Sequence, residues 1–155
     1  MTAYKKIFEC KNEEDTKKLA CLFAKISRKG DVFALYGTLG VGKSTFSRYF
    51  IQHLIGIIDV PSPTFTLVQT YSHKNFEIYH YDMYRLKHFE EAYELGIDEA
   101  FYNAVNLIEW PEKIEELLPK NTWKINIKTN ETSRLFEITA NTEEQIARLE
   151  GIVFE

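Results

Sequence analysis

The residues with the clearest chemical meaning form one short run, Gly37-Thr38-Leu39-Gly40-Val41-Gly42-Lys43-Ser44. The run fits the pattern G-x-x-x-x-G-K-[ST] in full. In this pattern the glycines let successive backbone amides point inward at phosphate oxygens, and the following helix presents its N-terminus to the anion. The lysine reaches the terminal phosphates as a mobile charge, and the last hydroxyl coordinates Mg²⁺. The run therefore predicts a site for a nucleoside triphosphate with magnesium.

The segments on both sides of this run have the character that such a loop requires. Residues 32–36 are a continuous apolar stretch, which is typical of a buried central strand. Residues 44–54 have apolar side chains at helical spacing, and Gly56 marks the end of the predicted helix. The chain has no Asn-Lys-x-Asp element of the kind expected in a guanine-binding protein, which favours adenine and thus ATP.

Two carboxylates end other predicted strands. Asp82 ends the β-rich segment 76–82, and Glu109 follows the apolar run 105–108. Ligands of open α/β sheets bind beyond the carboxyl ends of the strands, so both carboxylates are candidates for the γ-phosphate or the metal. The alternative is that each merely caps a strand or lies in a solvated turn.

Four further residues are each open to two interpretations. Ser62 and Thr64 lie on a segment that two prolines keep from being helical, where phosphate-loop enzymes commonly sense the γ-phosphate; a plain turn is the alternative. His80 is either a core histidine with satisfied hydrogen bonds or a functional residue. Trp110 stacks on the base or packs beside the site, and packing is slightly favoured.

The rest of the chain supplies the elements that must hold this site. Asn12 is predicted to open a helix with Asp15 as capping partner, and Gly30 to close it. Further strands are predicted at 4–9, 66–71, 76–82, 123–128 and 135–139, and short helices at 89–95, 98–103 and 143–149. This order predicts an α/β, P-loop NTPase-like domain that spans residues 1–155. Its sheet is expected to be mixed and mostly parallel at the centre, with helices on both faces and antiparallel hairpins.

Composition sets the class of protein. The 155 residues are 45% apolar and 27% charged, with a net charge of -4. A mildly acidic domain does not attract nucleic acid by its overall field. Cys10 and Cys21 lack metal-ligand spacing and are expected to be reduced thiols. No window approaches the roughly 18 apolar residues of a membrane span, so we expect a cytoplasmic protein without membrane contact.

Four blocks of sequence together resemble one family, the bacterial TsaE (YjeE) ATPases. The blocks are Gly37–Phe46, Ser62–Val68 (SPTFTLV), His80–Leu86 (HYDMYRL) and Ile108–Pro111 (IEWP). Their order and spacing are kept, and the resemblance covers about residues 12–140. One departure is Thr38, where the family usually has aspartate; this residue need not touch the nucleotide.

The resemblance implies a role in making the threonylcarbamoyladenosine of tRNA, beside the anticodon. It implies magnesium-dependent ATP hydrolysis that supports two partners, TsaD and TsaB, with tRNA reached only through their complex. At the matching positions Lys43 and Thr45 would contact phosphates, and Ser44 and Glu109 would hold magnesium. Asp82 would orient or activate the attacking water, with Thr64 and Ser62 reporting on the γ-phosphate. Glu13 and Thr16 would approach the adenine, and the role of Arg134 is open.

Other functions remain possible from the residues alone. A small-molecule kinase usually carries an arginine-rich lid, which this chain lacks. A module that binds nucleotide without hydrolysis, or a GTPase switch, would use the same loop. Arg85 is a candidate for stabilising charge during hydrolysis; otherwise a partner supplies such a group.

Overall fold

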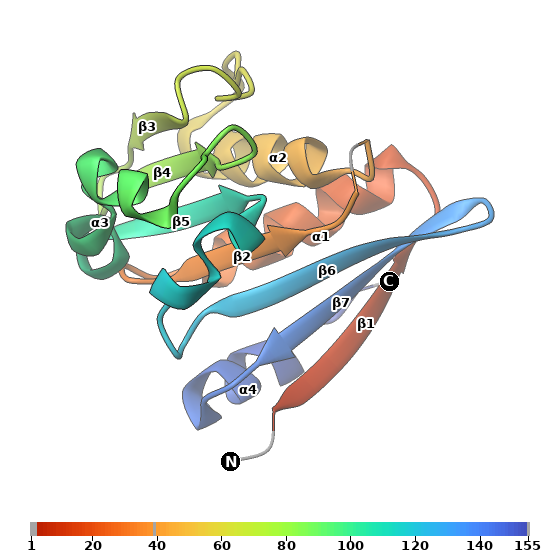
Figure 1. The fold of residues 1–155 in the computed structure, drawn as a ribbon. Coiled ribbons are helices and arrows are strands. Elements are labelled where there is room, and N and C mark those ends of the chain that lie inside the picture. Colours follow the sequence, from red (N-terminus) through yellow and green to blue (C-terminus); the bar gives the residue numbers. More distant parts are fainter. Residues whose placement is uncertain (1–2, 39, 155) are drawn as a thin grey trace.

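The computed structural model describes residues 3–38 and 40–154, and one sheet of seven strands organises them. Figure 1 shows the sheet with helices packed along it. The strand order is β1-β7-β6-β2-β5-β4-β3. The strands are β1 (Tyr4–Cys10), β2 (Val32–Tyr36), β3 (Val68–Ser72), β4 (Glu77–Asp82), β5 (Ala104–Glu109), β6 (Trp123–Asn130) and β7 (Ser133–Ala140).

The centre of the sheet is parallel and its two sides are antiparallel. Strands β6, β2, β5 and β4 run parallel to one another, whereas β1 and β3 are joined to the sheet by antiparallel pairing. Strand β7 pairs antiparallel with both β1 and β6. The predicted mixed sheet with antiparallel hairpins is confirmed, and the predicted P-loop NTPase-like α/β class with it.

Helices cover both faces of the sheet, as predicted. On one face lie α1 (Glu13–Ile26), α2 (Lys43–Ile55) and α4 (Glu143–Glu150), whose apolar residues share a core cluster. On the other face lie the 3₁₀ helices η1 (Phe89–Leu95) and η2 (Pro111–Leu117) and the helix α3 (Ile97–Asn103), which share a second cluster. Within the described residues no helix is long and apolar enough to cross a membrane.

An aromatic core fixes α1 and α2 on the strands that carry the loop. Phe33 of β2 stacks on Trp123 of β6 with ring centroids 5.8 Å apart, and its edge meets Phe50 of α2. Phe23 of α1 makes edge contacts with both Phe33 and Trp123. Each aromatic pair contributes about 0.5–1.5 kcal/mol beyond the burial of its area. The strand before the phosphate-binding run and the helix after it are therefore both packed into this aromatic core.

Three local predictions differ from the structure. The first helix ends at Ile26 with Ser27 as its cap, because Ser27 bonds back to Ala24; Gly30 lies in the turn beyond. Strand β3 begins at Val68, because Leu67 has a φ of 69° and its N–H closes a turn onto Pro63. The helix η2 was not predicted, although its proline is at the start, where proline is tolerated.

Candidate functional site

The glycine-rich run lies between β2 and α2, at the carboxyl end of the central strand. Gly37, Gly40 and Gly42 have φ angles of 147°, 78° and 119°, a region that side chains rarely adopt. A Cβ atom at Gly37 would also lie 2.6 Å from Cγ1 of Val41. These glycines therefore let the backbone turn sharply just ahead of a helix N-terminus, as a phosphate-binding loop requires. Leu39 lies outside the described residues, so its predicted contact has no counterpart here.

Lys43 is the first residue of α2, and its side chain is folded into the loop. It is only 4% exposed, its Nζ donates to the Gly37 carbonyl at 2.6 Å, and its Nζ lies 3.4 Å from the centroid of the Trp110 ring. Burial lowers the pKa of Lys43, and the carboxylates of Glu109, Glu112 and Asp82 offset part of that effect. The ammonium group thus lies where a polyphosphate would need it, and no carboxylate among the described residues forms an ion pair with it.

Ser44 and Glu109 come together beside this lysine. The Ser44 hydroxyl donates to Oε1 of Glu109 at 2.9 Å, and Nε2 of His80 lies 2.6 Å from Oε2. Glu109 is 2% exposed and ends β5, next to β2 in the sheet. A hydroxyl and a carboxylate beside a phosphate-binding loop are hard oxygen donors of the kind that Mg²⁺ prefers, so the residues present fit this ion.

Asp82 ends β4, directly beside Glu109 in the sheet register. Its Oδ1 accepts the N–H of Tyr84 at 3.0 Å, and its Oδ2 accepts the hydroxyl of Thr64 at 3.3 Å. The hydroxyls of Thr64 and Ser62 are in turn 2.9 Å apart. The proline-bracketed segment is therefore joined to the strand-ending carboxylate, as a segment that reports on the γ-phosphate would need to be.

Most of the remaining residues predicted to contact the nucleotide lie around residues 40–42 of the loop. A cavity of about 220 Å³ opens between the loop and the starts of α1 and β7. At its edge Arg134 Nε donates to the Val41 carbonyl at 2.9 Å, and Glu13 accepts the Tyr49 hydroxyl. The predicted residues that line the cavity are Glu13, Thr16, Gly40, Val41, Gly42, Thr45 and Arg134.

Two predicted residues lie apart from this cavity. Thr38 is exposed on the loop and is not part of the cavity lining. Trp110 packs between the Lys43 ammonium and the Tyr84 ring, whose centroid is 5.0 Å from its own. Its φ of 58° is the left-handed region, so the backbone turns sharply just after Glu109. Trp110 therefore packs beside the phosphate side of the loop in this structure.

Sequence reasoning did not place His80 in the site. The alternation of a strand puts His80 on the same face as Asp82, and this was the available signal. The contact with Glu109 also depends on the pairing of β4 with β5, which periodicity does not provide.

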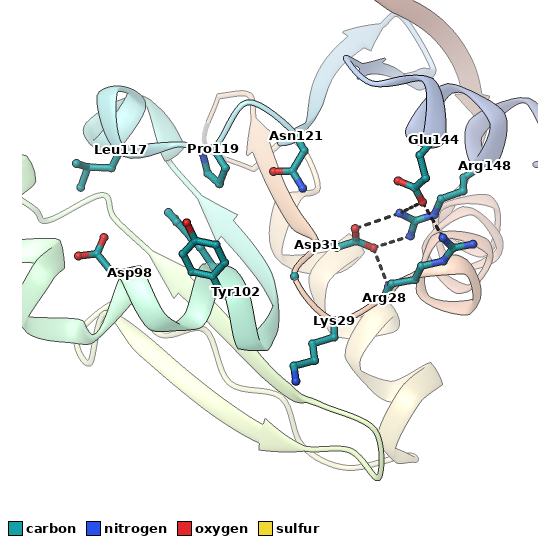
Figure 2. A pocket seen from close by; sticks show the side chains of 12 residues that line it. Arg28, Lys29, Asp31, Asp98, Tyr102, Leu117, Pro119, Asn121, Glu144 and Arg148 are labelled. Atoms are coloured by element: carbon teal, nitrogen blue, oxygen red, sulfur yellow. Dashed lines mark hydrogen bonds and ion pairs between the residues drawn. The ribbon is translucent and has the colours of Figure 1, made fainter.

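A larger cavity, of about 710 Å³, lies at the opposite ends of the central strands (Figure 2). Figure 2 shows Asp31 held by Arg148 and Arg28, with Glu144 beside them. The buried Arg148–Asp31 pair, at 2.6 Å, ties α4 to the start of β2. These charges largely neutralise one another, and none of the described residues of the glycine-rich run lines this cavity. The candidate nucleotide-binding residues therefore lie at the carboxyl ends of the strands, where open α/β sheets bind their ligands.

The fold and the loop together define a P-loop NTPase-like domain. Comparison with protein families then gives a match over residues 10–136 to "Threonylcarbamoyl adenosine biosynthesis protein TsaE". The chain belongs to the TsaE family.

Individual relatives agree with this assignment. The TsaE protein of Rickettsia felis is 47% identical over 135 residues, which cover 86% of this chain and 79% of that protein. The TsaE protein of Bacillus subtilis is 42% identical, over 76% of this chain and 73% of that protein. The crystal structure of Bacillus subtilis YdiB superposes with a TM-score of 0.82 at 33% identity, covering 97% of this chain and 95% of that one.

Proposed function

We propose that this protein binds ATP with magnesium and hydrolyses it as a component of the machinery that makes threonylcarbamoyladenosine in tRNA. The observation that carries the proposal is the convergence of Lys43, Ser44, Glu109 and Asp82 at the carboxyl ends of three adjacent parallel strands. Family membership supports the pathway, since relatives carry its name. The partners in the proposal are TsaD and TsaB, with tRNA reached through them and no membrane involved.

Each residue near the loop has a distinct role in this proposal. Lys43 moves its ammonium from the Gly37 carbonyl to the β- and γ-phosphates, and the loop amides hold the remaining oxygens. Ser44 and Glu109 hold magnesium, which supplies charge neutralisation at the phosphates. Asp82, with Thr64 donating to it, orients the water for in-line attack on the γ-phosphate. Glu13, Thr16 and Arg134 line the cavity in which the nucleoside end lies.

Glu109→Gln tests the magnesium role. Glutamine keeps the size of the side chain and can still bond to Ser44, but it lacks the negative charge. We expect the affinity for ATP in the presence of Mg²⁺ to fall about tenfold or more, because carboxylates dominate protein ligation of this ion. Affinity measured in EDTA should stay within about twofold of the unchanged protein. Calorimetry in the two buffers makes the comparison, and equal losses in both would contradict the metal role.

Hydrolysis is expected to be slow alone and faster in the complex. Arg85, the candidate charge-stabilising group, lies on the molecular surface with its guanidinium 4.5 Å from the ring of Phe65, which is 82% exposed. A partner docked on this surface is positioned either to move Arg85 or to supply another cation.

Phosphate release measured with and without TsaD and TsaB checks this expectation. We predict a stimulation of about tenfold or more; an added arginine supplies about 10³–10⁵-fold in other phosphate-loop enzymes. The same complex made with Lys43→Met is the control for hydrolysis by contaminants. Equal rates with and without the partners would contradict activation, and a phosphorylated small molecule in place of free phosphate would identify a kinase.

Cytoplasmic residence is also part of the proposal, supported by the two free cysteines.

A further inference from the structure

His80 is buried beside the candidate metal ligand without any role so far. It is 1% exposed, and its Nε2 lies 2.6 Å from Oε2 of Glu109, the shortest polar contact of that carboxylate. Because an ionised carboxylate only accepts hydrogen bonds, the ring proton is assigned to Nε2. The other nitrogen, Nδ1, has no hydrogen-bond partner in the described part of the chain. Among the described residues, the imidazole therefore forms a hydrogen bond only with Glu109.

A purely structural histidine does not explain this arrangement well. Burying a ring nitrogen without a partner costs free energy, and an apolar side chain of similar size would avoid that cost. Ile78 and Asp82, two residues to either side of His80, share its face of β4. Ile78 is fully buried and Asp82 ends the strand, so His80 lies between the apolar core and a strand-ending carboxylate.

We infer that His80 is a positioning residue that holds Glu109 in the orientation needed to bind magnesium. This inference rests on the proposed function, because it concerns the same metal ligand. Ser44 also bonds to Glu109, but Ser44 is exposed and is itself a candidate ligand of the ion. His80 contacts the other oxygen of the carboxylate and lies within β4, which is paired with β5, so it constrains the rotation of Glu109 from a neighbouring strand. Partners of this kind keep a ligating carboxylate in place, and their loss typically costs about 10–100-fold in metal affinity.

A matched pair of amides tests the inference. In His80→Gln the amide nitrogen reaches about as far as Nε2 and can donate to Glu109. In His80→Asn the same amide is one methylene shorter and falls short of that carboxylate. Both variants bury the same polar group, so a general effect of polarity or packing would act on both alike. His80→Leu is the apolar reference, without any donor.

The readout is the magnesium dependence of ATP binding, defined as the affinity in Mg²⁺ divided by the affinity in EDTA. We expect His80→Asn and His80→Leu to lower this ratio about 10–100-fold with unchanged affinity in EDTA, and His80→Gln to restore most of it. The inference is overturned if glutamine and asparagine lower the ratio equally, or if neither lowers it.

A double-mutant cycle adds a second criterion. In the Glu109→Gln background, His80→Asn should cause no further loss of the ratio, because the residue acts through that carboxylate. Losses that multiply would mean that His80 acts elsewhere, which overturns the inference. Failure of the unchanged protein to bind ATP at all would instead contradict the proposed function itself. Binding without hydrolysis would contradict the ATPase proposal and leave this test intact.

Discussion

Lys43→Met should lower the affinity for ATP about tenfold to hundredfold and reduce hydrolysis by at least about a hundredfold. A hydrogen bond to a charged group contributes about 1.5–3 kcal/mol, which corresponds to the change in affinity. The larger loss in rate follows because charge develops on the phosphates during transfer, and a preorganised cation acts most strongly there. Methionine fills the apolar space against Trp110, so the fold should persist. Calorimetry and phosphate release measure the two effects.

Lys29→Met is the matched control for Lys43→Met. Lys29 is exposed and lies before the start of β2, whereas the glycine-rich run lies after its end (Figure 2). The control therefore removes the same positive charge at the opposite end of the strand. Binding and turnover of the control should be unchanged. If Lys43→Met also bound ATP normally, the ammonium would serve only to brace the loop through its bond to Gly37.

Asp82→Asn is expected to separate binding from chemistry. Asparagine keeps Oδ1 for the Tyr84 N–H, and the amide nitrogen in place of Oδ2 can donate to the Thr64 hydroxyl. The substitution removes the negative charge that draws a proton from water. Turnover should therefore fall about 10²–10⁴-fold, the usual contribution of a general base. The affinity for ATP with magnesium should change by less than about threefold, a difference of under about 0.7 kcal/mol.

The matched control for Asp82→Asn is Asp98→Asn. Asp98 is exposed on α3 and lines the cavity at the opposite edge of the sheet. Its replacement should leave both quantities unchanged. Turnover at the full rate in Asp82→Asn would instead show that this carboxylate only fixes the turn to Tyr84 and the segment of Thr64.

Much of the fold could be predicted because local signals agreed with one another. The apolar run of β2, the glycine pattern and the amphipathic spacing of α2 each indicate the same strand, loop and helix. Asn12 was predicted as a cap, and its side chain accepts the N–H of Asp15. The turns were harder. The left-handed Leu67 delays β3, and no glycine or asparagine marks that position.

The sequence predicted which site residues lie at the ends of strands, but not the contacts between different strands and helices. Asp82 and Glu109 were expected at strand ends, and the register then brings them side by side. Contacts across elements have no local signal. The bond of His80 to Glu109 requires the pairing of β4 with β5, and the bond of Tyr49 to Glu13 requires the packing of α2 on α1. The Trp110 ring faces Lys43 because of a left-handed turn that its residue type does not favour.

A crystal structure with a non-hydrolysable ATP analogue and Mg²⁺ would show whether the nucleotide binds at the glycine-rich run. We expect the β- and γ-phosphates inside the loop of residues 37–44, with Lys43 Nζ on a phosphate oxygen in place of the Gly37 carbonyl. We also expect the ion beside Ser44 and Glu109. An analogue that is absent at saturating concentration, or that lies in the cavity between Asp31 and Tyr102 at the other end of the sheet, would contradict this expectation.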